Sequence, residues 1–300
     1  MMTKRAGYLL IFRALCVVLL LNFFAVQAAG AGEKVFMWKV DSQQATAYIL
    51  GTVHMLRAEM YPLDTRIESA FQKADAYAME FNLNEVGASQ TGTMMTDMLY
   101  RGDDTIGNHV SRETLDLVQK KIESYGLPFA MMSRFKSWSL AVTIEMFEYQ
   151  KLGLDLQYGI DKYFLQKAEG NKKIIELESF DSQMELFNSM SDRDQELFLI
   201  YSLKEVDDSK KNMEVLLNAW REGDSKAMER LMFKNAEDDS RLSRIYEKLF
   251  YERNRNMTDK IAKMLSQKGT YFVAVGAGHL VGKRGIIDRL LRQGYAVRQQ

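Results

Sequence analysis

The sequence predicts an α/β fold in which a central mixed sheet is built from the N- and C-terminal segments and carries a large helical insertion or cap. Three observations predict this fold. Apolar runs rich in β-branched and aromatic residues, typical of buried strands, occur near both ends of the chain, at residues 46–51 and 271–275. Residues 111–268, between them, show mostly helical periodicity. Finally, a glycine stands at the end of each apolar run, at positions 51 and 276, and a histidine stands three positions after each of these glycines.

The composition indicates a single large globular unit. The chain has 300 residues, of which 47% are hydrophobic, and only two prolines. We therefore expect one domain over residues 29–300, with the helical middle at about 111–268. The formal net charge is zero, which gives no reason to expect nucleic acid as a partner.

The first 28 residues have the pattern of a signal peptide. A basic start, which includes Lys4 and Arg5, precedes an apolar stretch at residues 14–26, and small residues suited to cleavage follow it. The apolar stretch is short for a transmembrane helix. We expect a periplasmic protein; the alternative is an uncleaved anchor in the inner membrane. The single cysteine, Cys16, lies inside this segment, so a cleaved chain would have no thiol for catalysis or metal binding.

The remaining elements follow from local patterns. Strands are expected at residues 35–40, 46–51, 76–81, 172–177, 271–275 and 295–297. Helices are expected at residues 64–74, 94–100, 111–125, 133–150, 161–169 and 280–292, with several more between 180 and 265. Asp64 and Ser111 are expected to cap the first and third of these helices.

Two histidines occupy the same local frame at opposite ends of the predicted domain. Residues 47–54 read Ala-Tyr-Ile-Leu-Gly-Thr-Val-His, and the motif glycine Gly51 stands three positions before His54. Gly276 stands at the same spacing before His279, with Gly278 between them. Glycines at a strand end permit a tight turn and a close approach of the backbone. Because ligands bind at the carboxyl edge of such sheets, we expect the fold to bring the two imidazoles together.

A candidate metal site is formed by His54, His279 and Glu80. Glu80 lies near the end of the strand predicted at 76–81. Two neutral imidazoles and one carboxylate suit a divalent ion such as Mn²⁺, Co²⁺ or Zn²⁺ and leave positions for water. Such an ion can generate a nucleophile from water near neutral pH. The third histidine, His109, lies in a predicted surface loop and is interpreted as structural.

Four further residues are candidates for supporting roles. Glu178 and Asp161 each lie near the end of a predicted element, where capping or a salt bridge explains them equally well. Arg253 and Asn254 lie on a predicted helix and have the chemistry to bind a carboxylate or orient a carbonyl.

These motifs resemble the TraB/GumN family, also called the TIKI-like or pheromone-shutdown family. Residues 50–54 and 275–280 carry the most specific part of the resemblance, and Glu80 falls where the family has a glutamate. Residues 159–161, 177–178 and 253–254 match weaker family positions. The chain departs from the family at Ser137, where members often have proline.

The resemblance implies an α/β fold with both histidine motifs at one site. Animal members of the family look like membrane-tethered metalloproteases that use Mn²⁺ or Co²⁺ and cleave a secreted signalling protein. Bacterial members are linked with inhibition of peptide pheromones or with polysaccharide production. We therefore expect a periplasmic metal-dependent hydrolase, with a peptide or small protein as substrate.

In that reading, His54, Glu80 and His279 hold the metal. Glu178 or Asp161 acts as general base or supports a ligand, and Arg253 with Asn254 anchors the substrate. Three alternatives stay open: a metal-free hydrolase similar to the erythromycin esterases, a protein that sequesters a peptide without cutting it, and a structural protein with two buried histidines.

Overall fold

Six strands form one mixed sheet at the centre of the computed structural model, which describes residues 34–85 and 88–300. The strand order is β4-β3-β5-β2-β1-β6. The strands are β1 (Met37–Asp41), β2 (Ala45–Thr52), β3 (Ala76–Met79), β4 (Lys173–Glu176), β5 (Gly269–Gly276) and β6 (Ala296–Gln299). β2, β5, β3 and β4 are parallel neighbours, whereas β1 runs antiparallel to both β2 and β6. The predicted α/β class is confirmed, and the sheet also takes β4 from the middle of the chain.

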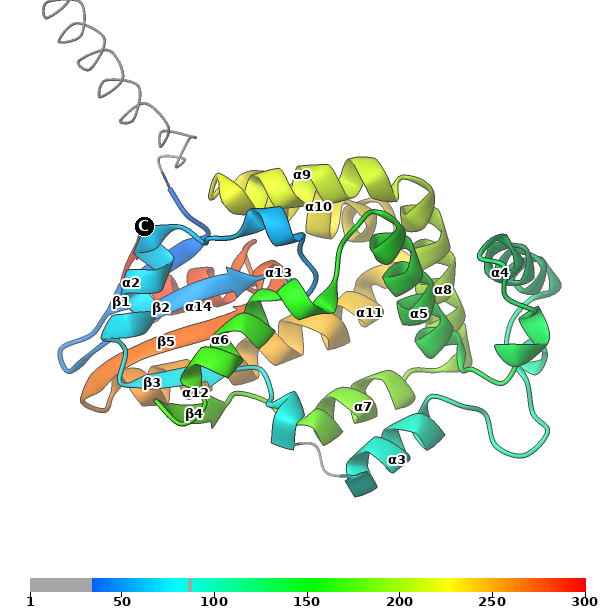
Figure 1. Cartoon of the computed structure of the whole chain (residues 1–300), viewed down its shortest axis with the longest axis horizontal. Helices are drawn as coiled ribbons and strands as arrows, with labels where there is room; N and C mark the ends of the chain where they lie inside the picture. The colour runs from blue at the N-terminus through cyan, green and yellow to red at the C-terminus, as the bar shows by residue number, and fades with distance from the viewer. Residues whose placement is uncertain (1–33, 86–87) are drawn as a thin grey trace, which may run out of the picture. The chain divides into compact units, whose positions relative to one another are not determined.

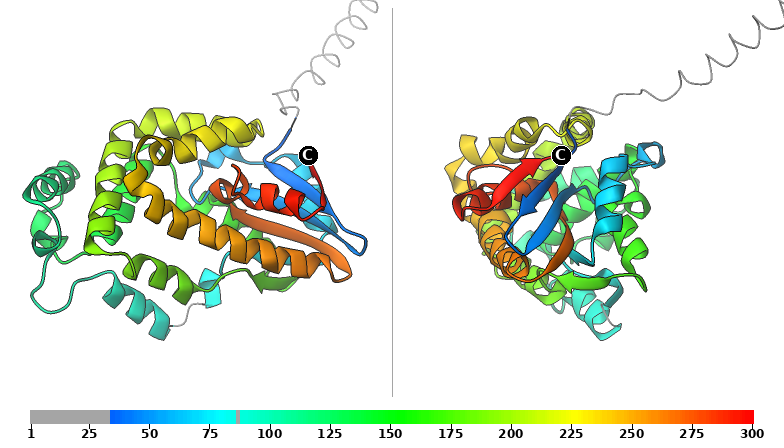
Figure 2. Two further views of the ribbon diagram at one scale, coloured as in Figure 1. Left: turned by 180° about the vertical axis from the view of Figure 1, so that it is seen from behind. Right: turned by 90° about the vertical axis from the view of Figure 1, so that its left-hand side faces the viewer.

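Helices cover both faces of the sheet, and its central strands are accordingly mostly apolar. On one face lie α2 (Thr65–Lys73) and α6 (Ile160–Ala168), and on the other lie α12 (Arg253–Leu265) and α14 (Ile286–Arg292), as Figures 1 and 2 show. The ring of Phe272 in β5 packs against Phe71 of α2 at 5.3 Å and against Phe164 of α6 at 4.8 Å, measured between ring centroids. These contacts tie the C-terminal strand to helices from earlier in the chain.

The helical middle of the chain gathers beyond the carboxyl ends of the parallel strands, whose arrows point toward it in Figure 1. Its helices are α3 (Ala88–Asp97), α4 (Arg112–Ser124), α5 (Ser137–Lys151), α7 (Phe180–Asn188), α8 (Asp192–Asp207), α9 (Ser209–Arg221), α10 (Ser225–Asp238) and α11 (Ser243–Tyr246). Part of this region has a core of its own, in which Ile144 of α5 and Leu199 of α8 are completely buried. It forms the helical cap that the sequence predicts.

Short helical segments connect these elements. They are η1 (Ala58–Met60), η2 (Leu83–Glu85), η3 (Ile106–Asn108), η4 (Phe129–Met131), η5 (Leu156–Tyr158), η6 (Ser240–Leu242), the π-helical η7 (Glu247–Glu252) and the one-turn α13 (Ala277–Leu280). η7 joins α11 to α12 without a break, so α12 starts as the continuation of a π-helical turn.

Some helix ends agree with the sequence and others differ. Asp64 caps α2 by accepting from the Arg66 N–H, and Ser111 caps α4 by accepting from the Thr114 N–H, as predicted. The helix expected from residue 133 begins at Ser137, because the residues before it pair through a β-bridge between Phe135 and Leu99. The helix expected at residues 94–100 is α3, which already begins at Ala88 and ends at Asp97.

The helix expected from residue 280 is split. His279 lies in α13, and α14 begins only at Ile286. The turn between them contains Gly282, whose φ of 83° lies in the left-handed region and interrupts the helix.

The signal peptide predicted at residues 1–28 lies outside the described residues. Residues Lys34–Gln300 form one compact unit. Within the described ranges, 34–85 and 88–300, no helix has the length and apolar character needed to cross a membrane.

Candidate functional site

Four of the candidate residues lie at the carboxyl ends of four neighbouring parallel strands. His54 follows β2, His279 follows β5 in α13, Glu80 follows β3, and Glu178 follows β4. The four strands are adjacent in the order β4-β3-β5-β2 and run in the same direction. Their carboxyl ends therefore share one edge of the sheet, where ligands bind in open α/β folds.

Three of these side chains converge beside Gly276. A Cβ atom placed on Gly276 would lie 3.3 Å from Glu80 Oε1, 3.5 Å from His279 Cδ2 and 4.0 Å from His54 Nε2. All three groups thus come within 4.0 Å of one point. Glu80 Oε1 also accepts a hydrogen bond from the Gly276 N–H at 2.7 Å and lies 3.9 Å from His279 Nε2. The missing side chain of Gly276 leaves this space open.

His54 is oriented by Asp161, which the sequence left as a weak candidate. His54 Nδ1 lies 2.8 Å from Asp161 Oδ2, and Thr52 Oγ1 donates to Asp161 Oδ1 at 2.7 Å. Asp161 lies in the first turn of α6, whose N-terminus abuts the backbone of His54. A Cβ on Gly159 would collide with the His54 carbonyl, so glycine is needed there for this close approach.

His279 is oriented by Asn254, and both residues are buried. Asn254 Oδ1 accepts from His279 Nδ1 at 2.6 Å, while Asn254 Nδ2 donates to the Arg284 carbonyl oxygen at 3.0 Å. The second bond fixes which way the amide points, so His279 carries its proton on Nδ1 and keeps a lone pair on Nε2. Burial lowers the pKa of His279 to about 4, so the ring is neutral near pH 7.

Arg253 links two carboxylates across the site. It donates to Glu80 Oε2 at 2.6 Å and to Glu178 Oε2 at 2.7 Å, and its Nε donates to Glu178 Oε1 at 2.9 Å. The Glu80 and Glu178 side chains are only 10% and 8% exposed, so this shared guanidinium compensates two desolvated charges. Glu178 thus holds Arg253 in place, and both carboxylate oxygens of Glu178 accept hydrogen bonds from the guanidinium.

The charges of these groups have different origins. Burial raises the pKa of Glu80, but positive charge on His279, Arg253 and His54 outweighs it and lowers the pKa to about 2. Because His279 is neutral near pH 7, Arg253 and the protonated His54 supply the positive charge that keeps Glu80 ionised. The Asp161 carboxylate raises the pKa of His54 to about 9. Water and salt screen part of that effect, since 66% of the His54 side chain is exposed.

The other two motif glycines make room for packing around the site. A Cβ on Gly51 would collide with the ring of Phe36 and with the Ala277 Cα. A Cβ on Gly278 would lie 2.8 Å from Met232 Cε and 3.0 Å from Phe250 Cε1. Phe250, in η7, also packs against the His279 ring at 5.3 Å between centroids. π-helical turns are frequent at functional sites, and this one places Phe250 and Arg253 on the site.

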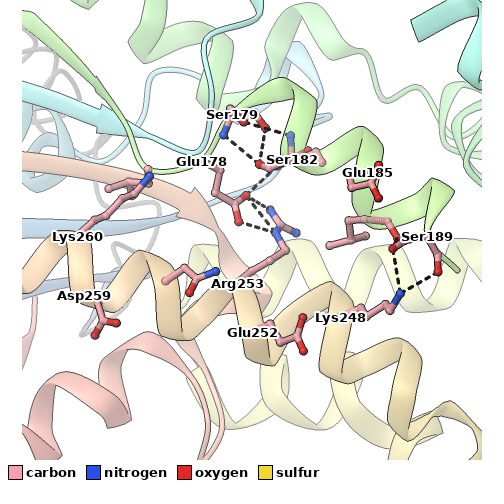
Figure 3. Close-up of a pocket in the computed structure, with 14 residues that line it drawn as sticks. Glu178, Ser179, Ser182, Glu185, Ser189, Lys248, Glu252, Arg253, Asp259 and Lys260 are labelled. Carbon is pink, nitrogen blue, oxygen red and sulfur yellow. Dashed lines mark hydrogen bonds and ion pairs between the residues drawn. The ribbon is translucent and has the colours of Figure 1, made fainter.

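A polar groove of about 700 Å³ opens beside the Glu178–Arg253 pair. It runs between α7 on one side and η7 with α12 on the other, as Figure 3 shows. Its lining includes Ser179, Ser182, Lys248 and Asp259, which offer both donors and acceptors.

The donor set resembles a metal site but is not a preformed one. In the described part of the chain, no three His, Cys, Asp or Glu side chains are arranged as a ready metal centre. Glu80 Oε1 faces the Gly276 N–H, and Oε2 faces Arg253. Each imidazole, however, has its Nδ1 held by an oxygen, which is how metal-binding histidines are usually oriented.

Sequence reasoning missed one polar contact of the site and interpreted another residue correctly. Gln183 of α7 donates to Glu80 Oε2 at 3.2 Å and to Glu178 Oε2 at 3.0 Å. Nothing in the sequence near Gln183 indicates this contact. His109 is structural: its ring stacks on Tyr100 at 3.9 Å and contacts Asp104 and Asp192.

Comparisons with known proteins find relatives that match most of the chain. The chain is 27% identical over 246 residues to the YbaP protein of Escherichia coli (strain K12). The aligned residues cover 82% of this chain and 87% of that protein. A protein of Treponema pallidum (strain Nichols) is 23% identical over 299 residues, covering 91% of this chain and 88% of that protein.

A shorter match links the chain to a named protease. The metalloprotease TIKI homolog of Amphimedon queenslandica is 43% identical over 51 residues, which is 16% of this chain and 10% of that protein. No solved structure matches the chain. The model of the TraB/PrgY/gumN family matches residues 36–299. Since this match spans nearly the whole described chain, the protein belongs to the TraB/PrgY/gumN family.

Proposed function

We propose that the protein is a metal-dependent hydrolase whose ion is held by His54, Glu80 and His279. One observation carries the proposal: two imidazoles, each fixed through Nδ1, approach an ionised carboxylate at a point kept open by a glycine. Nitrogen and carboxylate ligands in this number suit Mn²⁺, Co²⁺ or Zn²⁺ and leave coordination positions for substrate and water.

The residues present fit such an ion. Asp161 and Asn254 supply the oxygen partners that orient metal-binding imidazoles. Glu80 stays ionised, and its Oε1, which accepts a hydrogen bond from the Gly276 N–H, retains a second lone pair, whereas Oε2 accepts from both Arg253 and Gln183. When bound, a divalent ion supplies Lewis-acid chemistry, which polarises a carbonyl and makes water a better nucleophile.

The chain's own residues divide the remaining work. Asp161 and Asn254 hold the rings in place, and Arg253 lines the groove, where its guanidinium can receive a carbonyl or carboxylate of the substrate. Hydrogen bonds from Arg253 and Gln183 to Glu178, and from Gln183 to Glu80, hold these side chains in position. The exposed His54 side is open to solvent, so water can enter there.

A peptide or small protein is the substrate class that these features favour. The groove is lined by side chains that offer both donors and acceptors, which can pair with the N–H and C=O groups of a peptide backbone. The short similarity to the sponge metalloprotease TIKI homolog supports the same class. We place the reaction in the periplasm, because residues 1–28 have the pattern of a signal peptide. Mass spectrometry of the periplasmic fraction should find a mature N-terminus between residues 29 and 32; a full-length chain confined to membranes would indicate an anchor instead.

The His54–Asp161 pair favours a second candidate, a metal-free hydrolase. Asp161 holds one nitrogen of an exposed imidazole, and the other nitrogen is free to exchange a proton with substrate or water. This arrangement needs no ion. Chelation separates the two candidates: activity that survives exhaustive EDTA treatment and dialysis supports the metal-free reaction.

The experiment is a cleavage assay on a mixed fluorogenic peptide library with EDTA-treated protein, to which Mn²⁺, Co²⁺ or Zn²⁺ is returned. We expect activity to return with at least one ion, and Glu80→Gln to need a higher ion concentration because a charged ligand is lost. His109→Gln is the matched control, since this histidine lies outside the site. Peptide binding without cleavage, unchanged in His54→Ala, would instead indicate a sequestering protein.

A further inference from the structure

A second cavity, of about 280 Å³, lies in the helical cap and shares a wall with the candidate site. It is lined by residues of α5, α8, α9, α10, η6, α11 and η7. Met232 and Phe250 form the shared wall, because they line this cavity and also pack against Gly278. Phe250 separates the cavity from the His279 ring by a single aromatic side chain. We call this space the cap cavity.

The lining of the cap cavity contains both carboxyl groups and aromatic rings. Glu145 and Glu205 supply its carboxyl groups, and Tyr149, Tyr246 and Phe250 are among its aromatic lining residues. Aromatic faces favour both an apolar chain and a positive charge. The volume suits one long side chain rather than a folded peptide.

The two carboxyl groups differ in how they are compensated. Glu205 accepts from Asn212 at 2.8 Å and from Asn235 at 2.9 Å, and Lys234 lies 3.3 Å from its Oε1. In the part of the chain that the structure describes, no Lys, Arg or His forms an ion pair with Glu145.

Glu145 is therefore the carboxyl group with unused binding capacity. Burial raises its pKa to about 7; a hydrogen bond from Ser202 opposes this, and the charge of Glu205 adds to it. The other titratable groups of the cavity wall are the hydroxyls of Tyr149, Tyr201 and Tyr246, which are neutral near pH 7. A ligand that brought a positive charge to Glu145 would supply the missing compensation.

We propose that the cap cavity is a specificity subsite for a substrate side chain with an apolar stem and a cationic end, that is, a lysine or arginine. The stem would lie along Tyr149 and Phe250, and the cationic end would meet Glu145, with Glu205 behind it. This inference deepens the proposed function, on which its assignment to a peptide substrate rests. The cavity itself can be tested without any reaction.

The direct test uses n-butylguanidine as probe and n-butylurea as its neutral counterpart, titrated into the full protein and followed by NMR. We expect the cation to bind at least 10-fold more tightly than the urea. Glu145→Gln should remove this difference while the fold persists, since it replaces a desolvated carboxyl with a neutral group of equal size. Glu148→Gln is the matched control on the same helix, because Glu148 is bonded to Tyr125 and does not line the cavity.

Equal binding of the two probes to the wild-type protein would overturn the proposal, and so would an equal loss in Glu145→Gln and Glu148→Gln. The wild-type comparison holds even where a variant fails to fold. A second arm compares cleavage of peptide pairs that differ only by arginine or norleucine at one position. Cleavage with no preference at any position would leave the hydrolase standing and refute the subsite. Cation binding through Glu145 without any cleavage would support the cavity and refute the hydrolase.

Discussion

Replacing Asn254 by alanine tests how the site holds His279. The Asn254 side chain is fully buried and makes two hydrogen bonds, one to His279 Nδ1 at 2.6 Å and one to the Arg284 carbonyl oxygen at 3.0 Å. Asn254→Ala leaves the buried His279 Nδ1 without this partner, whereas the Arg284 carbonyl oxygen still accepts from Arg289 Nε at 3.3 Å. An orphaned buried group costs about 1–3 kcal/mol, so the free energy of unfolding should fall by roughly that amount. With its Nδ1 released, the ring of His279 loses its fixed orientation.

The same change should weaken metal binding by about 10–100-fold, which is the usual effect of removing the partner of a metal-bound histidine. Urea unfolding measures the first quantity, and calorimetric titration with Mn²⁺ and Zn²⁺ measures the second at a temperature where the variant is folded. Asn256→Ala is the matched control: it makes the same chemical change on the same helix, at an exposed position. It should change the unfolding free energy by less than about 0.5 kcal/mol.

The reasoning would be refuted if Asn254→Ala unfolded like Asn256→Ala and bound metal like the wild type. A large loss of stability with unchanged metal affinity would also count against it. In that case Asn254 would support the fold, and His279 would need no fixed ring orientation.

Three further predictions follow from the geometry. Gly276→Ala should leave the fold intact, since φ is −50° there, but its Cβ would crowd Glu80 Oε1 at 3.3 Å and weaken metal binding in the same titration. Arg253→Met should cost about 3–5 kcal/mol in urea unfolding, because Glu80 and Glu178 would be left as buried, uncompensated neighbours; a loss below 1 kcal/mol would contradict this. Glu145→Gln should change how stability depends on pH. Folding raises the Glu145 pKa from 4.5 to about 7, so the folded state binds this proton more tightly. The stability that this bound proton contributes is fully present below pH 4.5 and is lost as pH rises through about 7. Between pH 4.5 and about 7, the free energy of unfolding of the wild type should fall by up to about 3 kcal/mol relative to that of the variant. A difference in unfolding free energy that stays constant with pH would be inconsistent with a buried Glu145.

Much of the sheet could be predicted because its strands are short apolar runs that end in polar or glycine-containing turns. The repeated glycine and histidine spacing indicated that His54 and His279 lie on one edge, and parallel pairing of β2 with β5 places both histidines there. The end of the helix containing His279 was harder to predict, because Gly282 interrupts a pattern that is otherwise helical.

The partners of the two histidines could not be assigned from sequence. Asp161 lies 107 positions from His54, and Asn254 lies 25 positions from His279, so only tertiary packing brings them together. No local sequence pattern indicates the contacts of Gln183 or the π-helical turn before Arg253. Sequence therefore indicated which residues gather at the site, whereas the hydrogen bonds that orient them required the structure.

The measurement that tests the central claim most directly is the metal content of the purified, untagged protein after EDTA treatment and reconstitution with Mn²⁺, Co²⁺ or Zn²⁺. We predict about one tightly bound ion per chain, from the three proposed ligands. The His54→Ala/His279→Ala variant should retain almost none, and His109→Ala should bind like the wild type. A wild-type protein that binds no ion under any of these conditions, or a double variant that binds as much as the wild type, would contradict the account.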